Sequence, residues 1–270
     1  MNKPMTDTVS LAAHRARATD EGLFLHEVAA DELQDRLDMV NKPFTSAAIV
    51  TGFPEFWTTR HPTTKLAPDT EALDLELQTH DLVAHMMSLH WANDPVGQLI
   101  QCRRALKPDG LFIAVSFGGD TLQELRRALG EAEIEVTGGL SPRIAPLPEL
   151  RDLGDLLQRA GFALPVADTS TLTVEYRDIW HLMHDLRAMG ETNALASRLR
   201  QPTRRTVFER AQSLYAEHFA APSGRLKASF EFQVLTGWAP HSSQPQPLRP
   251  GSAQQRLADA LGTPEKPLRD

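Results

Sequence analysis

The feature that most constrains this chain is residues 81–117, where two apolar runs enclose a segment with helical signals. The runs Leu82–Met87 and Leu111–Phe117 lack polar alternation, which is typical of strands that are buried on both faces. Asp94 can cap a helix between them, and Lys107–Gly110 (KPDG) predicts the turn that ends this helix. The pattern predicts a βαβ unit in a mostly parallel α/β sheet that is covered by helices.

The segment before this unit predicts a shortened start to the sheet. Two helical pieces are expected within residues 11–36, and Ala47–Thr51 is expected to be a buried strand that ends at Gly52. Thr64–Pro68 predicts a short edge strand. Only 29 residues separate Gly52 from Asp81, whereas a complete βαβ passage takes about 30 residues by itself. The second βα unit is therefore expected to be trimmed.

The second half of the chain predicts further helices and a late strand. Thr121 with Glu124, or Asp120 with Gln123, forms the pattern of a capping box at the start of one helix. Ala228–Trp238 alternates in part, as expected of an antiparallel strand added late to a mixed sheet. Further helices are expected at residues 149–160, 178–189, 191–200 and 203–219, and strand material at 162–177.

The expected organisation is a helical flank at 1–40, a main domain at 41–239 that includes a helical cap at 177–220, and a mobile tail at 240–270. The tail is rich in Pro, Gln and Ser, with one helical candidate at Ala253–Leu261. At 270 residues with 41% hydrophobic content, the chain can bury a sizeable core.

Charge and cysteine content narrow the function classes. A net charge of −7 argues against a general nucleic-acid binder, which needs a clustered cationic surface. The single Cys102 excludes an intrachain disulfide and fits a reducing compartment. His181 and His184 are three residues apart, but no third ligand is visible, so no metal site is expected. Neither an apolar signal segment nor a transmembrane run is present.

Ligands of open α/β sheets bind outside the carboxyl ends of the strands. After the first expected strand Gly52 is the single glycine, and Phe53 and Pro54 that follow it are poor material for a phosphate cradle. Asp69 lies 17 residues after Gly52, close to the roughly 20-residue spacing expected of a ribose-binding acid. A solvated loop acid explains Asp69 equally well.

Two candidate catalytic residues follow the central strands. His90 lies just past the first of them and can accept a proton, while Trp91 offers an apolar or cation–π wall to a substrate guanidinium or sulfonium. Packing of the strand-to-helix corner explains both residues as well. Asp120 follows the second central strand, where it can orient a substrate or cap the next helix.

Three residues further along the chain are candidates for substrate binding. Arg143 lies in a loop rich in Gly and Pro and can bind a carboxylate or phosphate through its guanidinium. Glu191 and Asn193 follow the helix break at Gly190 and can line the cap side of a cleft, although a surface turn would explain them too.

A series of motifs resembles a known family. They are SLHWANDPVGQLIQCRRALKPDGLFIA, FGGDTLQELR, GGLSPRIAP, DLGDLLQRAGF, LRAMGETNA and TGWAPHSSQPQPLRPGSA. In this order they resemble the methyltransferase-fold assembly factors of respiratory complex I, including bacterial relatives, from Phe24 to the tail. A more distant likeness is to the malonyl-acyl-carrier-protein O-methyltransferase of biotin synthesis. The resemblance implies a Rossmann-like class I methyltransferase sheet, mostly parallel, with a late antiparallel strand, shortened N-terminal βα units and a small helical cap.

The resemblance also implies a cofactor, S-adenosyl-L-methionine (SAM), and a partner, which is a protein substrate or a respiratory complex subunit. SAM would lie near Gly52, Asp69, Met87, Ser88 and Leu89. In the family the first strand normally ends in an acidic, glycine-rich loop, whereas this chain has AAIVTGFPEFW. The cofactor loop is thus degenerate.

Three functions follow from the resemblance. The first is methyl transfer from SAM to an unidentified substrate. The second is a complex I assembly factor with a pseudo-methyltransferase or protein-arginine-modifying role, since such relatives have been linked to arginine hydroxylation. The third is methylation of a malonyl-acyl carrier protein. The expected location is the bacterial cytoplasm, at the inner membrane through a partner, in preference to the mitochondrial matrix.

Overall fold

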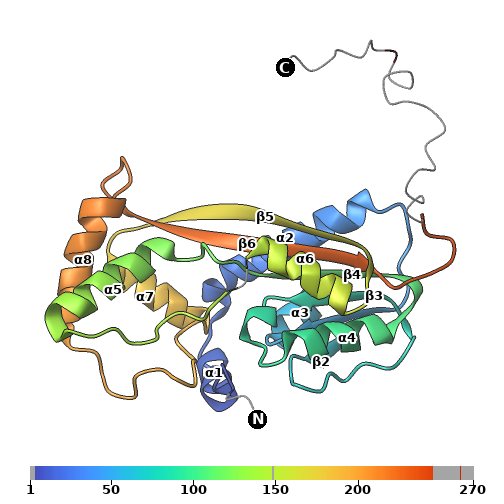
Figure 1. The fold of residues 1–270 in the computed structure, drawn as a ribbon, viewed down its shortest axis with the longest axis horizontal. Coiled ribbons are helices and arrows are strands. Elements are labelled where there is room, and N and C mark those ends of the chain that lie inside the picture. Colours follow the sequence, from blue (N-terminus) through green and yellow to red (C-terminus); the bar gives the residue numbers. More distant parts are fainter. Residues whose placement is uncertain (1–3, 148, 246–261, 263–270) are drawn as a thin grey trace, which may run out of the picture. The chain divides into compact units, whose positions relative to one another are not determined.

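A computed structural model describes residues 4–147, 149–245 and 262 of the chain (Figure 1). The chain divides into two units, residues 1–240, which contain all the named helices and strands, and residues 241–270. The helix expected at Ala253–Leu261, and most of the expected tail, lie outside the described residues. The α-helices are α1 (Thr8–Arg15), α2 (Phe24–Met39), α3 (Pro54–Arg60), α4 (Pro95–Ala105), α5 (Gln123–Thr137), α6 (Leu150–Arg159), α7 (Ile179–Ala188) and α8 (Arg205–Phe219).

Six strands form one sheet in the order β2-β1-β3-β4-β6-β5. The first four run parallel, and β6 pairs antiparallel with both β4 and β5. The expected mostly parallel sheet with a late antiparallel strand is therefore confirmed. The strands are β1 (Ala47–Thr51), β2 (Lys65–Pro68), β3 (His80–Met86), β4 (Leu106–Phe117), β5 (Ala163–Tyr176) and β6 (Leu226–Trp238), and two short 3-10 helices are η1 (Asp20–Leu23) and η2 (Leu89–Trp91).

The start of the sheet is shortened as the sequence predicts. A doubly wound sheet usually has the order 3-2-1-4-5-6, but here β2 is the edge strand and no further strand of the described chain lies beyond it. The chain moves outward from β1 to β2 and then returns to form β3 on the other side of β1. Such a reversal leaves a crevice outside the carboxyl ends of the adjacent strands β1 and β3.

Each face of the sheet packs against its own helices. Successive strand residues point to opposite faces, so Ile49 packs with one core while Ala48 and Val50 pack with the other. The first core joins residues of α2, α3, α5, α7 and α8, and the second joins residues of α4 and α6. Burial of both faces is confirmed for β3 and for the second half of β4.

The central unit follows its sequence signals with one difference. The Asp94 carboxylate accepts a hydrogen bond from the Gly97 N–H at 2.8 Å and caps α4 as expected. Lys107–Gly110 was expected to be a turn, but it lies within β4. Asp109 there has a left-handed φ of 61°, and the β3–β4 register shifts between His80 and Leu82, so the turn residues form an irregular strand start.

Two local predictions are wrong because distant residues compete for the same groups. The capping box at Thr121 and Glu124 does not form, since the buried Glu124 carboxylate accepts hydrogen bonds from the N–H and Oγ–H of Ser229. The helix expected at 191–200 is also absent. This segment instead makes backbone hydrogen bonds to residues 5–7, and Thr6 forms a β-bridge with Leu195.

The helices α5, α7 and α8 gather at one end of the long β5–β6 pair (Figure 1). Their shared core includes the buried residues Tyr176, Leu182 and Tyr215. Among the described residues, no helix has the length and apolar character needed to cross a bilayer.

Candidate functional site

The functional candidates from the sequence lie at the carboxyl edge of the parallel strands. Gly52 follows β1, Asp69 follows β2, and Met87–Trp91 follow β3. Of these, Met87, Ser88 and Leu89 are 1%, 1% and 5% exposed, and both apolar side chains pack in the cores of the sheet. His90 and Trp91 continue past them, in η2, towards the helical elements after β5.

His90 and Trp91 meet Glu191, which follows α7. The helix ends at Ala188, and Gly190 shortly after it has a φ of 76°, which suits a residue without a side chain. The Trp91 Nε1–H donates to Glu191 Oε2 at 2.7 Å, and His90 Nε2 lies 3.4 Å from the same oxygen. The other carboxylate oxygen, Oε1, is buried without a hydrogen-bond partner. The three residues therefore form a buried polar cluster with one open acceptor.

The charge of Glu191 is maintained despite its burial. Burial alone would raise the pKa of this carboxyl group, but His90, the positive charge of Arg15 and the Trp91 N–H together lower the pKa below its ordinary value. Glu191 is consequently an anion at neutral pH. A buried carboxylate with an unsatisfied oxygen favours a ligand that carries positive charge and N–H donors.

A cavity of about 80 Å³ adjoins this cluster. Its lining brings together five residues that the sequence singled out from separate segments: His90, Trp91, Arg143, Glu191 and Asn193. Phe117 at the end of β4 adds an aromatic wall. Pockets for drug-sized ligands take roughly 300–1,000 Å³, so this cavity suits the head group of one side chain.

Arg143 and Asn193 shape the cavity wall through partners of their own. The Arg143 guanidinium donates to both carboxylate oxygens of Glu133, at 2.8 and 3.1 Å, and to the Thr203 hydroxyl. Asn193 Nδ2 donates to the Pro142 carbonyl. The positive charge of Arg143 is thus balanced by Glu133.

Asp120 lies apart from this cluster. Asp120 is an exposed residue in the loop after β4, and its backbone N–H donates to the Glu231 carboxylate at 2.7 Å. Asp120 is not among the residues that line the cavity, although Thr121 and Leu122 directly after it are.

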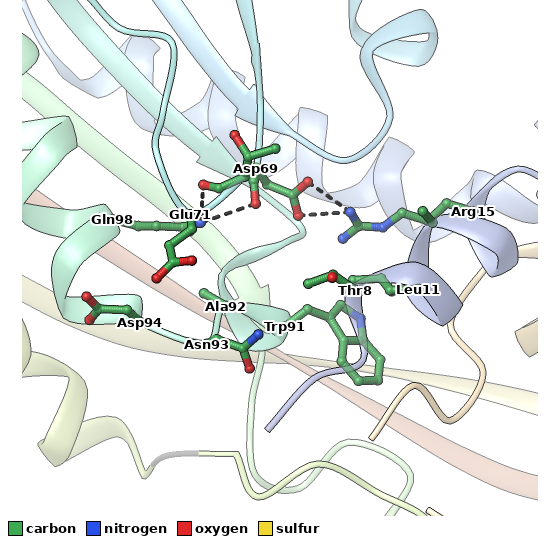
Figure 2. Close-up of a pocket in the computed structure, with 12 residues that line it drawn as sticks. Thr8, Leu11, Arg15, Asp69, Glu71, Trp91, Ala92, Asn93, Asp94 and Gln98 are labelled. Atoms are coloured by element: carbon green, nitrogen blue, oxygen red, sulfur yellow. Dashed lines mark hydrogen bonds and ion pairs between the residues drawn. The ribbon is translucent and has the colours of Figure 1, made fainter. Parts of the chain in front are cut away.

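A second pair of candidates, Gly52 and Asp69, lies beside Arg15, a residue that the sequence did not single out. Arg15, the last residue of α1, places Nη1 at 2.9 Å from both carboxylate oxygens of Asp69 (Figure 2). A Cβ built on Gly52 would lie 2.2 Å from the Arg15 guanidinium carbon. The same guanidinium lies 5.6 Å from the centre of the Phe53 ring. Arg15 therefore fills the space between the β1 loop and Asp69.

The loop that carries Asp69 is fixed by a buried network. Gln98 of α4 donates to the backbone carbonyls of Asp69 and Thr70, at 3.2 and 2.9 Å (Figure 2). Its side-chain oxygen lies 2.9 Å from His85 Nε2, on β3. Burial lowers the pKa of His85, so the ring is neutral and donates from Nε2. Asp69 is thereby placed at the crevice and is more than a solvated loop acid.

The residues at the crevice do not fit a nucleoside cofactor in this arrangement. The acid that would pair with a ribose is taken by Arg15, and the loop that would approach the cofactor is covered by the same guanidinium. The shortage of glycines after β1 was the available sequence signal for this misfit. Within the described ranges, no group of three or more His, Cys, Asp or Glu residues is placed to hold a metal ion.

Comparisons with known proteins agree with the fold. Residues 41–114 match a family model described as a methyltransferase domain. The structure of the YcgJ protein from Bacillus subtilis aligns with 79% of this chain and 100% of its own, at 11% identity and a TM-score of 0.50. This likeness shows the fold alone.

Two kinds of curated relatives are similar in sequence. The zebrafish (Danio rerio) protein named arginine-hydroxylase NDUFAF5, mitochondrial, is 35% identical over 92% of this chain and 71% of its own length. A malonyl-[acyl-carrier protein] O-methyltransferase of Nitrosospira multiformis is 34% identical over 65% of this chain and 54% of its own. The chain spans 43–57% of the length of other relatives named NDUFAF5, from Dictyostelium and mammals.

These names correct the expected location. The sequence favoured the bacterial cytoplasm over the mitochondrion, but the NDUFAF5 relatives, at 35–42% identity, are named as mitochondrial proteins. The expectation of a bacterial cytoplasmic protein is therefore wrong.

Proposed function

This chain belongs to the family of the arginine-hydroxylase NDUFAF5, and on that premise we propose that it binds and modifies an arginine side chain of a partner protein. The guanidinium enters the cavity formed by His90, Trp91 and Glu191. The partner that the sequence resemblance implies is a subunit of respiratory complex I. The name of these relatives indicates the class of modification, and the residues of this chain supply the recognition.

The observation that carries the proposal is the open oxygen of Glu191. Its Oε2 is held by Trp91 and His90, while the buried Oε1 lacks a partner in a cavity with aromatic walls. A planar guanidinium presents several N–H donors to one carboxylate and stacks on aromatic rings, whereas an ammonium is a compact and strongly hydrated charge. Arginine is therefore the preferred occupant.

Each cavity residue has a separate part in this recognition. Glu191 pairs with the guanidinium, and the Trp91 N–H and His90 Nε2 keep the carboxylate in a single orientation. Phe117 lines the same cavity and excludes water from the pair. A charged pair that is shielded from water is stronger than an exposed one. The cavity therefore binds the arginine guanidinium more strongly than an exposed carboxylate would.

The direct test measures binding of three small probes: N-acetyl-arginine methylamide, its lysine counterpart and its citrulline counterpart, which keeps the shape but lacks the charge. We expect the arginine probe to bind at least tenfold more tightly than the citrulline probe, as measured by NMR titration. Glu191→Gln should abolish that difference. Glu131→Gln, an exposed carboxylate on α5, is the matched control and should leave binding unchanged.

Two results would contradict the proposal. One is equal binding of the arginine and citrulline probes to the unmodified protein. The other is unchanged arginine binding in a folded Glu191→Gln variant, with folding checked by thermal unfolding. If Glu191→Gln does not fold, Trp91→Phe serves instead, because it keeps an aromatic ring in the wall and removes the N–H that orients Glu191.

Methyl transfer is a second candidate, favoured by the match of residues 41–114 to the methyltransferase domain model. It requires that the unmodified protein bind SAM. Calorimetry with SAM separates the two candidates, since tight binding would favour methyl transfer. The contact between Arg15 and Asp69 is the reason to expect little binding.

A further inference from the structure

The carboxyl edge of the sheet contains two cavities that share one ion pair. A cavity of about 510 Å³ is lined by Gly52 and Phe53 after β1, and a second of about 210 Å³ is lined by Trp91 and Gln98. Arg15 and Asp69 line both. Their side chains are 11% and 14% exposed, so the ion pair is a largely buried partition between the two cavities.

The partition occupies the part of the crevice that a nucleoside would need. Asp69 directly follows β2, where an acid of this fold accepts hydrogen bonds from ribose hydroxyls. Both Asp69 oxygens are already engaged by Arg15 Nη1. Removal of the guanidinium would uncover Gly52 and free Asp69 together, because the same group covers both.

From this geometry we propose that Arg15 is a built-in competitor: its guanidinium occupies Asp69 and keeps the crevice closed to adenine nucleosides. The residues that would receive a ribose are present, but a side chain of the same protein holds them. Opening the crevice requires that Arg15 leave Asp69, which joins the two cavities into one.

The helix that carries Arg15 is fixed, so the side chain is the part that moves. Asp7 caps α1, and its carboxylate accepts hydrogen bonds from Arg198 at 2.9 Å and from Arg200 at 3.3 Å. The backbone N–H of Asp7 also donates to the Ala194 carbonyl. These contacts hold the start of α1 independently of Arg15.

The guanidinium itself is incompletely satisfied. Arg15 Nε and Nη2 are buried without hydrogen-bond partners. Buried donors without partners lose the hydrogen bonds that water would give them. The closed position is therefore held mainly by the single contact to Asp69, and a ligand that competes for Asp69 can displace it.

The test measures the binding of S-adenosylhomocysteine and of adenosine by calorimetry to the unmodified chain and to Arg15→Ala. We expect Arg15→Ala to bind both at least tenfold more tightly. Asp69→Asn, added to Arg15→Ala, should remove most of that gain, because the carboxylate is the ribose partner. Arg17→Ala, an exposed arginine two residues away, is the matched control and should bind like the unmodified chain.

Several outcomes would overturn the proposal. One is a folded Arg15→Ala variant that binds no more tightly than Arg17→Ala. Another is an Arg15→Ala variant that binds more weakly than the unmodified chain, which would make Arg15 a ligand-binding residue. A gain that survives Asp69→Asn would also contradict it. If Arg15→Ala does not fold, Arg15→Met keeps the aliphatic stem and removes only the guanidinium. Because no arginine probe is used, failure here is distinct from failure of the proposed function.

Discussion

Gly22 is the glycine with the most rigid surroundings in the described chain. A Cβ at this position would lie 2.4 Å from the backbone carbonyl carbon and oxygen of Ala188, at the end of α7. Neither atom can rotate away, because both belong to the backbone. Gly154 in α6 is the opposite case, since nothing lies within 4 Å of its added Cβ.

We therefore expect opposite effects from two alanine substitutions. Gly22→Ala should lower the free energy of unfolding by about 1–3 kcal/mol, because the overpacked site must separate η1 from α7. Gly154→Ala should raise it by roughly 0.5–1 kcal/mol, since alanine is the better helix former. Urea unfolding of both variants measures the difference. Equal effects would mean that η1 and α7 are not packed as described.

At the same scale, the sequence indicated more of the cavity beside Glu191 than of the crevice. His90, Trp91, Glu191 and Asn193 were singled out because they follow strand ends and a helix break, and those are positions that topology brings together. Arg15 gave no such signal. Its partner Asp69 is 54 residues away, and their contact depends on how α1 docks, which local patterns do not encode.

At the scale of elements, one glutamine connects three parts of the molecule. Gln98 of α4 bonds to His85 of β3 and to the loop after β2. Gln98→Leu would leave the buried His85 N–H and two carbonyls without their partner. We expect a loss of about 1–3 kcal/mol in the free energy of unfolding, together with faster hydrogen exchange in residues 69–75.

Gln158→Leu is the matched control, because Gln158 is an exposed residue of α6. Its effect should stay within about 0.5 kcal/mol. Urea unfolding measures the stability of both variants. If Gln98→Leu were no worse than this control, the network would not hold the loop of Asp69.

Elements with strong local signals were predicted well, and those decided by distant contacts were not. β1, α4 and α8 follow from apolar runs, a capping aspartate and helical periodicity. The segment 191–200 has helical composition, yet residues 5–7 take its backbone groups instead. Glu124 likewise leaves its expected cap for Ser229, which is 105 residues away.

At the scale of the whole molecule, buried neutral histidines make the fold sensitive to acid. Burial lowers the pKa of His26 to about 4, despite the opposing effect of Glu191, and burial also lowers the pKa of His80 and His85. An unfolded histidine has a pKa near about 6.5. As the pH falls below that value, the unfolded state binds protons before the folded state does, so stability is lost.

For His26 alone, we expect a loss of about 1 kcal/mol in the free energy of unfolding between pH 7 and 5.5, levelling off below about pH 4. His26→Phe should reduce this pH dependence by that amount. His218→Gln, an exposed histidine of α8, should leave it unchanged. Urea unfolding at the two pH values is the measurement, and an unaltered slope in His26→Phe would contradict the expectation.

The parallel pairing of β3 with β4 was predictable from buried apolar runs, and the trimmed second unit from the short interval between Gly52 and Asp81. The way in which α1 fills the place of the trimmed βα unit was not predictable. The docking of α1 across the strand ends depends on Asp7 and its two arginines near residue 200, a pairing that no local pattern indicates.

Trp91 lines both the small cavity beside Glu191 and the crevice beside Asp69. The two cavities therefore share the Trp91 indole as part of their walls. A substitution of Trp91 therefore alters both cavities at once, so evolution cannot change the shape of one of them through this residue without changing the other.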